Sequence, residues 1–273
     1  MSMSAAAFVR MAAEHGVPLG QLRWGAMLLE NDPAMALHWF ILAARAGNAE
    51  AMNMAGRCHE NGWGVPVDLE RAADWFHRSA QAGHDWGEYN YANALFDGRG
   101  VPCDRRQALL YYRRAADRGH SRAMNLLGRC YEQGWGCAAN RDFAAIWYGR
   151  SAAAGYFRGQ YNHGCRLLED GHIAEATFWL AEAAAEGDDA IRRGVERLLA
   201  TYGGPQTPSM MTMSSCFSGG ASPAPSGSSL RSSERDASRS SSYRGTAYIS
   251  SPSHRDRDRC AQPSGLGVPP DCG

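Results

Sequence analysis

The sequence has 273 residues, 28 of them basic and 28 acidic, and it contains no lysine, so every basic residue is an arginine. The absence of lysine excludes enzymes that depend on one, namely P-loop nucleotide hydrolases, protein kinases, penicillin-binding serine enzymes and pyridoxal enzymes. The balanced charge also argues against the basic groove of a nucleic-acid-binding domain.

The composition changes near residue 202. All eight tryptophans lie before this point, whereas residues 203–273 hold 18 serines, nine glycines and eight prolines. A segment so poor in large apolar residues cannot bury a hydrophobic core. We therefore expect a folded domain over residues 5–201, followed by a disordered tail rich in Ser, Gly, Pro and Arg over residues 202–273.

A pattern that repeats every 36 residues runs through the first part of the chain. A sustained period in this range is typical of a solenoid, in which short helix pairs stack side by side. The pattern is carried by Gly47, Gly83, Gly119 and Gly155, by Trp39, Trp75, Tyr111 and Trp147, and by Gly62, Gly98 and Gly134.

The unit at residues 49–83 shows what each repeat predicts. Residues 49–60 have helical periodicity, and Gly62 supplies the left-handed residue that commonly ends a helix. A second helix is expected after Asp68, because an aspartate oxygen can accept a free backbone N–H of the first turn. The same N-cap position holds Asp32, Asp104 and Asn140 in the other units.

The pattern continues towards both ends with shorter connections. Residues 8–16 and 178–187 match the end of a unit, and residues 188–199 are more polar, as a helix that caps the stack should be. The sequence therefore predicts an all-α fold of about twelve helices in antiparallel pairs between residues 5 and 201.

The run from Ala49 through Gly62 and Trp75 to Gly83, which returns at residues 121–155, resembles the Sel-1-like repeat, a relative of the tetratricopeptide repeat. The long loop between the two helices, clearest at Gly98-Arg99-Gly100-Val101-Pro102, favours the Sel-1-like form. The resemblance covers about residues 5 to 200. It implies a right-handed α-solenoid that acts as an adaptor or scaffold in protein complexes.

A stripe along each first helix is the candidate binding site. Positions i, i+4 and i+7 share one helix face, which lines the concave groove if the related tetratricopeptide geometry applies. Polar and aromatic sets alternate along the stripe with a period of 72 residues; an alternative is that the repeats merely pack differently, with Tyr89 and Phe96 in the core. The candidates are Asn53, Arg57, Glu60, Tyr89, Asn93, Phe96, Asn125, Arg129, Glu132 and Tyr161.

These observations favour a non-enzymatic adaptor that binds a protein or peptide partner in the groove, with no cofactor and no metal. Arg57 and Arg129, each about one helical turn from a glutamate, are the central candidates, because arginine is a frequent interface anchor. A hydrolase with an active site in the solenoid cleft is one alternative, although Cys58 and the adjacent His59 point about 100° apart on a helix and Cys58 fits a buried position better.

The other alternative is nucleic-acid binding through the arginines of the tail, which the interspersed acidic residues oppose. The tail also has the composition of a linker or of a frame-shifted C-terminus. The first residues show no signal-peptide pattern, and no stretch approaches the length of a membrane span. The sequence therefore predicts a cytoplasmic protein without a membrane partner.

Overall fold

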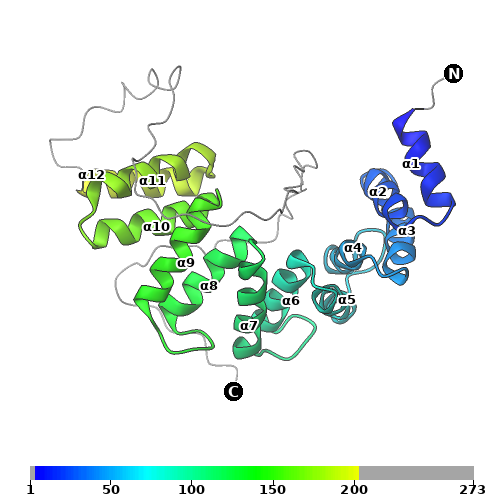
Figure 1. The fold of residues 1–273 in the computed structure, drawn as a ribbon, viewed down its shortest axis with the longest axis horizontal. Coiled ribbons are helices and arrows are strands. Elements are labelled where there is room, and N and C mark those ends of the chain that lie inside the picture. Colours follow the sequence, from blue (N-terminus) through cyan, green and yellow to red (C-terminus); the bar gives the residue numbers. More distant parts are fainter. Residues whose placement is uncertain (1–3, 203–273) are drawn as a thin grey trace, which may run out of the picture. The chain divides into compact units, whose positions relative to one another are not determined.

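The computed structural model describes residues 4–202, and this part of the chain consists of α-helices joined by short connections (Figure 1). Its helix number and helix limits confirm the all-α prediction, while the predicted tail lies outside the described residues. The twelve helices of residues 4–202 are α1 (Ala5–Glu14), α2 (Pro18–Leu28), α3 (Pro33–Arg45), α4 (Ala49–Asn61), α5 (Leu69–Gln81), α6 (Asp85–Asp97), α7 (Arg105–Asp117), α8 (Ser121–Gln133), α9 (Arg141–Ala153), α10 (Phe157–Glu169), α11 (Ile173–Glu186) and α12 (Asp189–Tyr202).

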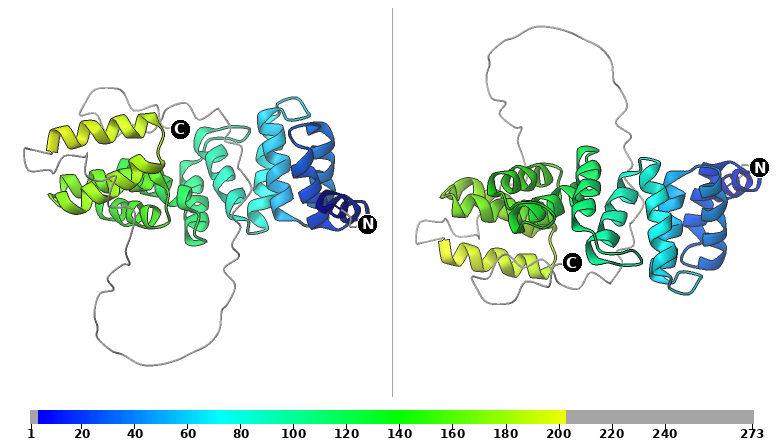
Figure 2. Two further views of the ribbon diagram at one scale, coloured as in Figure 1. Left: turned by 90° about the horizontal axis from the view of Figure 1, so that it is seen from above. Right: turned by 90° about the horizontal axis from the view of Figure 1, so that it is seen from below.

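Each helix packs against its neighbours in the chain, so the helices form antiparallel pairs that stack in chain order into an α-solenoid (Figures 1 and 2). Each repeat consists of a first helix, which has an even number, a loop and a second helix, which has an odd number. The first helices α4 and α6 also pack on each other, as do α8 and α10, whereas the described second helices approach one another less. The first helices therefore form the inner layer and the second helices the outer layer.

The interior of each pair is built from alanines and one large side chain. This large residue holds the same position in successive second helices and packs into the first helix, where Gly56, for example, leaves room for the ring of Phe76. Burying a side chain of this size contributes about 1.5–3 kcal/mol. The residues at this position are Phe40, Phe76, Tyr112, Tyr148 and Leu180, each at most 2% exposed.

The predicted N-caps are confirmed at each of the four second helices where the sequence places one. The carboxylate of Asp68 accepts a hydrogen bond of 2.9 Å from the backbone N–H of Arg71, three residues into α5. Asp32, Asp104 and Asn140 make the equivalent bond at α3, α7 and α9, at 3.0, 2.8 and 2.9 Å. Because the bond needs only residues three apart, it was readable from the sequence.

The Gly-x-Gly loops serve two purposes. The first glycine, such as Gly98, ends the first helix in the left-handed conformation. The second glycine, Gly100, also has a positive φ of 72°, and a Cβ placed on it would overlap the carbonyl of Leu69 at the start of the preceding second helix. Gly64 and Gly136 make the same close approach to α3 and α7. The loop therefore fixes how closely one repeat lies against the repeat before it.

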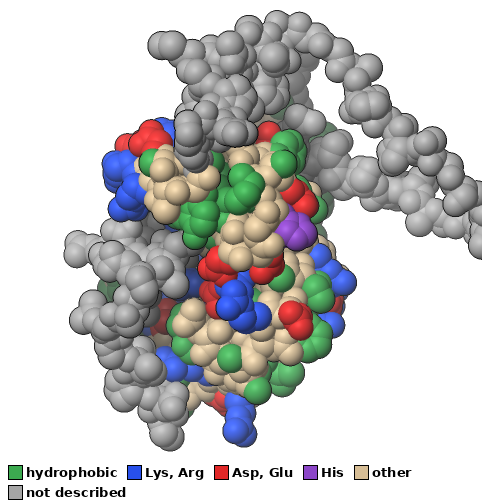
Figure 3. Space-filling model, turned by 90° about the vertical axis from the view of Figure 1, so that its left-hand side faces the viewer, with side chains coloured by type: hydrophobic (Ala, Val, Ile, Leu, Met, Phe, Trp, Pro, Cys, Tyr) green, Lys and Arg blue, Asp and Glu red, His purple; other side chains and the backbone are tan. Residues whose placement is uncertain are grey.

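Helix α12 completes the stack. Its apolar side, with Ile191 and Val195 buried, packs on α10 and α11, while Arg192, Arg193, Glu196 and Arg197 are exposed, as expected for a polar cap. Figure 3 shows hydrophobic, acidic and basic side chains together on the face at this end. Across residues 4–202, no helix combines the length and apolar character that a membrane span needs.

We expect Gly100→Ala to destabilise the solenoid by about 3 kcal/mol, because the left-handed backbone costs an alanine roughly 1–2 kcal/mol and the new Cβ must also displace α5. Gly47→Ala is the matched control, since Gly47 has a φ of 87° and nothing within 4 Å of the added Cβ. Urea unfolding of both variants measures the difference. Equal losses of stability would show that the contact with Leu69 has no role.

The N-cap of α8 is a buried histidine. Nδ1 of His120 accepts a hydrogen bond of 3.1 Å from the backbone N–H of Ala123, and the side chain is packed between aromatic rings. Burial lowers the pKa of His120 from 6.5 to about 4, with Arg122 acting in the same direction and the carboxylate of Asp85 opposing it. The ring is therefore neutral in the folded chain near neutral pH.

Between pH 6.5 and about 4 the unfolded chain binds a proton at His120 that the folded chain does not, so stability is full above this window and falls as the pH decreases through it. Asparagine can keep the N-cap, as Asn48 does in α4, but it does not titrate. We therefore expect the free energy of unfolding of His120→Asn to fall by up to about 3 kcal/mol less than that of the unaltered chain as the pH decreases. Urea unfolding between pH 4.5 and 7, with the exposed His38→Asn as control, measures the slope. A slope equal to that of the unaltered chain would assign the acid sensitivity to other groups.

Candidate functional site

The structure divides the ten candidate residues into two groups of five. Buried side chains, at most 8% exposed, are those of Asn53, Tyr89, Asn93, Asn125 and Tyr161. Half-buried side chains, which reach solvent, are those of Arg57, Glu60, Phe96, Arg129 and Glu132. Only the second group can meet a partner without rearrangement of the helices.

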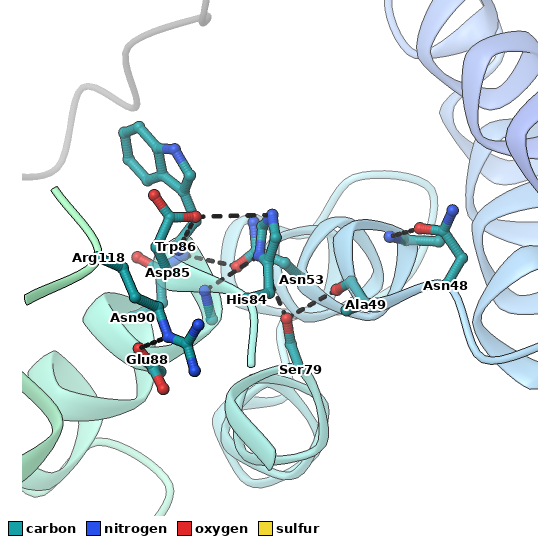
Figure 4. Close-up of polar contacts among 12 residues, drawn as sticks. Asn48, Ala49, Asn53, Ser79, His84, Asp85, Trp86, Glu88, Asn90 and Arg118 are labelled. Atoms are coloured by element: carbon teal, nitrogen blue, oxygen red, sulfur yellow. Dashed lines mark hydrogen bonds and ion pairs between the residues drawn. The ribbon is translucent and has the colours of Figure 1, made fainter. Parts of the chain in front are cut away.

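Hydrogen bonds between first helices join α4 to α6 and α8 to α10. The side-chain amide of Asn90 donates to Oδ1 of Asn53 over 2.8 Å (Figure 4), and Asn162 donates to Asn125 over the same distance. We call a contact between two successive first helices a seam, and these two are the polar seams. The buried asparagines therefore hold neighbouring repeats together.

The glutamates of the stripe also contribute to the polar seams. Glu60 accepts a hydrogen bond of 2.7 Å from Arg99, in the loop of the next repeat, and Glu132 accepts one of 3.2 Å from Arg166 of α10. The sequence placed these glutamates beside the arginines of their own helices. The structure instead gives each of them an ion pair with the following repeat, because the seam brings the two first helices together.

The contact between α6 and α8 is an aromatic seam. The ring of Tyr89 stacks on His120 with centroids 4.7 Å apart, and Phe96 meets Trp135 edge to face at 5.2 Å. The alternative of a packing role thus holds for Tyr89, which is buried, while Phe96 remains half-buried. The backbones of α6 and α8 approach less closely than those at the polar seams, as rings of this size require.

This alternation of polar, aromatic and polar seams accounts for the 72-residue period of the sequence. Each polar seam has an acceptor asparagine on one first helix and a donor asparagine on the next, and this pair returns two repeats later. Alternate repeats also share a buried serine: Oγ of Ser79 donates to the carbonyl of Ala49, and Ser151 donates to that of Ser121 (Figure 4). The period is therefore first of all a feature of packing.

The two candidate arginines lie over tryptophan rings. The guanidinium of Arg57 is 5.0 Å from the ring centroid of Trp63, and that of Arg129 is 5.4 Å from Trp135. Both tryptophans occupy the residue after the glycine that caps the first helix, and both are half-buried. Each guanidinium is held over its ring by a cation–π contact, and Nη1 of Arg57 also donates to Sδ of Met54 over 3.9 Å.

The accessible line along the first helices coincides only in part with the predicted stripe. On α4, Arg57 and Glu60 of the stripe reach solvent and Asn53 is buried. Met54, Arg57 and Asn61 form a second accessible set beside the stripe. Both sets follow helical spacing, so periodicity alone does not separate them. We name the accessible set the open face; it consists of Met54, Arg57, Asn61, Asn90, Leu126, Arg129, Gln133 and Asn162, all half-buried except the exposed Gln133.

A buried carboxylate lies behind the open face. Glu88 of α6 has no exposed side-chain surface, and its oxygens lie 2.9 Å from Arg114 of α7 and 3.3 Å from Arg118, the residue that caps the end of α7. Figure 4 shows Glu88 and Arg118. Burial raises the pKa of Glu88, and the two arginines act in the opposite direction. Removing one partner of such a buried pair is costly, so Glu88 binds α6 to α7 in this repeat.

Two cysteines of the first helices have the properties of core residues, while Cys165 of α10 is half-buried. Cys58 and Cys130 are at most 2% exposed, and burial raises the pKa of each thiol to about 12. A nucleophilic cysteine needs a lowered pKa and access to substrate. Within residues 4–202 there is also no group of three or more His, Cys, Asp or Glu side chains arranged to hold a metal ion.

Comparison with known proteins identifies the repeats. The Sel1 repeat model matches residues 19–48, 49–84, 87–120, 121–156 and 158–188, which together make up more than half of the chain. These five matches correspond to successive helix pairs of the solenoid. No curated protein matches the chain.

The solved structures with the same fold include proteins from three bacteria. A protective antigen of uropathogenic Escherichia coli with an SLR fold is 29% identical, with a TM-score of 0.63 over 72% of this chain and 44% of that one. A Sel1 repeat protein from Oxalobacter formigenes is 25% identical, with a TM-score of 0.64 over 71% of this chain and 58% of that one.

A Klebsiella pneumoniae Sel1 repeat protein, 20% identical, matches with a TM-score of 0.50 over 71% of this chain and 99% of that one. This third match shows the likeness of the fold alone. The chain spans about half the length of the first two proteins, so it corresponds to part of each. The five repeat matches, which fall on successive helix pairs and cover more than half of the chain, show that the chain belongs to the Sel1 repeat family.

Proposed function

We propose that this chain is a non-enzymatic adaptor that binds a protein or peptide partner along the open face of its first helices. Sel1 repeats typically mediate protein interactions, which supports a binding role over catalysis. The observation that carries the proposal is the pair of equivalent Arg–Trp stacks at Arg57 and Arg129. The proposal keeps the cytoplasmic location favoured by the sequence, which cell fractionation tests.

The chemistry of the open face suits a peptide backbone with carboxylates. Guanidinium edges at Arg57 and Arg129 offer planar donors for carboxylates or backbone carbonyls of the partner, and arginine and tryptophan are the residues that most often dominate binding energy at interfaces. Asn90 of α6 adds an amide group between the two stacks, and Asn162 of α10 adds one beyond Arg129. Because the two arginines occupy equivalent positions 72 residues apart, one extended partner can meet both.

Arg57 and Arg129 take no part in the hydrogen bonds described for the polar seams. Asn90 and Asn162, also of the open face, do take part in them. Arg57 and Arg129 each contact a half-buried ring, and such a stack contributes about 0.5–1 kcal/mol at an accessible site. A loss of both side chains therefore leaves the seams and the caps in place. Binding and stability can be tested separately for this reason.

We expect Arg57→Ala combined with Arg129→Ala to weaken peptide binding at least about tenfold, which corresponds to 1.4 kcal/mol. Peptides are selected from a displayed random library on the immobilised full chain, and the affinity of each selected peptide is then titrated for both proteins. Circular dichroism and thermal melting of the double variant should be almost unchanged.

The matched control is Arg78→Ala combined with Arg150→Ala. These two arginines also lie over tryptophans, 5.1 Å from Trp75 and 4.6 Å from Trp147, and they too are 72 residues apart, but they belong to second helices. We expect this control to retain binding. If the selected peptides bind both double variants as well as the unaltered chain, the partner site does not lie on the open face.

A further inference from the structure

The outer layer of the solenoid carries a line of exposed apolar side chains. Leu110 of α7, Ile146 of α9 and Phe178 of α11 are 64%, 50% and 56% exposed, and they hold the same position in three successive second helices. Phe143, one turn before Ile146, is also 50% exposed. We call these four residues the outer ridge.

The outer ridge is confined to the later repeats. The equivalent position is Asp74 in α5 and His38 in α3, and both are exposed polar side chains. The family fold therefore does not require an apolar residue here. Single exposed apolar residues are ordinary, but aligned ones on neighbouring elements mark an interaction surface.

The charges beside the outer ridge change sign along it. On α7, Arg106 is exposed and has no ion pair within residues 4–202, while the exposed Arg113 pairs with Asp117 of the same helix over 3.0 Å. On α11, none of Glu175, Glu182 and Glu186 forms an ion pair within the same residues. Helix α9, between them, carries both signs with Asp142 and Arg150. The outer layer is thus basic at α7, apolar with mixed charge at α9 and acidic at α11.

We propose that a second copy of this chain covers the outer ridge and forms a two-fold dimer whose axis runs parallel to α9. A surface that pairs with itself must be complementary to its own image under the two-fold rotation. Rotation about an axis along α9 places α7 of one copy opposite α11 of the other. Ile146 then meets its own counterpart, and Leu110 meets Phe178 of the second copy.

The charges of α7 and α11 favour this arrangement over the other two-fold packing of the same face, whereas Asp142 and Arg150 of α9 each meet their own counterpart across the axis. With the axis along α9, Arg106 in the first turn of α7 faces Glu175 in the first turn of α11, and this contact occurs twice in each dimer. With the axis perpendicular to α9, α7 faces α7 and α11 faces α11, so like charges oppose one another. The outer ridge belongs to second helices and the open face to first helices, so this dimer neither needs nor blocks the proposed partner site.

Sedimentation of the full chain tests the dimer. We expect a concentration-dependent dimer across about 1–200 μM, a range that reveals micromolar affinity. Ile146→Asp should remain monomeric over this range while its melting temperature stays close to that of the unaltered chain, because the side chain is half exposed. Met27→Asp is the control, since Met27 of α2 is 48% exposed and lies on a first helix. A monomeric unaltered chain, or a dimer that survives Ile146→Asp, would overturn the proposal.

Charge reversal tests the direction of the axis. Arg106→Glu alone should weaken the dimer about tenfold, since it turns two attractions into two repulsions. Adding Glu175→Arg to the same chain restores both pairs with exchanged signs and should recover the affinity to within about threefold. A double variant as weak as Arg106→Glu would contradict the facing of α7 and α11.

Discussion

The closest backbone contact between repeats is the constraint on which the rest of the solenoid depends. Gly64, Gly100 and Gly136 each bring a loop against the first turn of the preceding second helix, at a distance that leaves no room for a Cβ. Because three successive repeats are placed on the preceding one by the same contact, their N-caps, large core side chains and first helices recur every 36 residues. The repeat of α10 and α11 lacks this contact, since nothing lies within 4 Å of a Cβ on Gly171. This repeat is joined to α8 by the hydrogen bonds of Asn162 and Arg166.

Within this frame, neighbouring first helices are joined by two different kinds of chemistry. The asparagine and arginine bonds of the polar seams are specific in direction, with a donor on one helix and an acceptor on the next. The aromatic seam needs only complementary shape. A buried hydrogen bond costs stability when one partner is lost, so the polar seams fix which helix follows which. The accessible side chains of the open face are carried by helices whose order is fixed in this way.

Local features of the fold could be predicted from the sequence, and features that depend on contact between repeats could not. Asp68 caps a helix through a residue three positions away, and Gly62 ends one through its own backbone, so each was visible in a short window. The family resemblance supplied the order of the stack. The ion pair of Glu60 with Arg99 joins residues 39 positions apart and needs the placement of one repeat on the next.

The candidate site, too, could be predicted only as far as local helical spacing allows. Arg57 and Arg129 reach solvent as the helical spacing suggests, but Asn53 and Asn125 are buried while Met54 and Leu126 are accessible. Adjacent residues on a helix differ in direction, so a small rotation of the helix decides which of the two is buried. The packing between neighbouring first helices sets this rotation, and the sequence alone does not show it. The outer ridge escaped the sequence analysis because Leu110, Ile146 and Phe178 occupy positions that any amphipathic pattern assigns to the boundary between core and surface.

The alternating seams also govern how such a chain can change in length. Loss of one repeat, residues 85–120, would bring α4 against α8, and Asn53 would then face Leu126 in place of Asn90, with Trp135 in place of Arg99. The new contact between α4 and α8 would leave the buried amide oxygen of Asn53 and the carboxylate of Glu60 without their hydrogen-bond donors. Loss of two repeats, residues 85–156, would bring Asn53 against Asn162, the equivalent of Asn90, and so restore the asparagine pair of the polar seam. The unit that evolution can add or remove at low cost in this chain is therefore the pair of repeats, even though the unit that recurs in the fold is the single one.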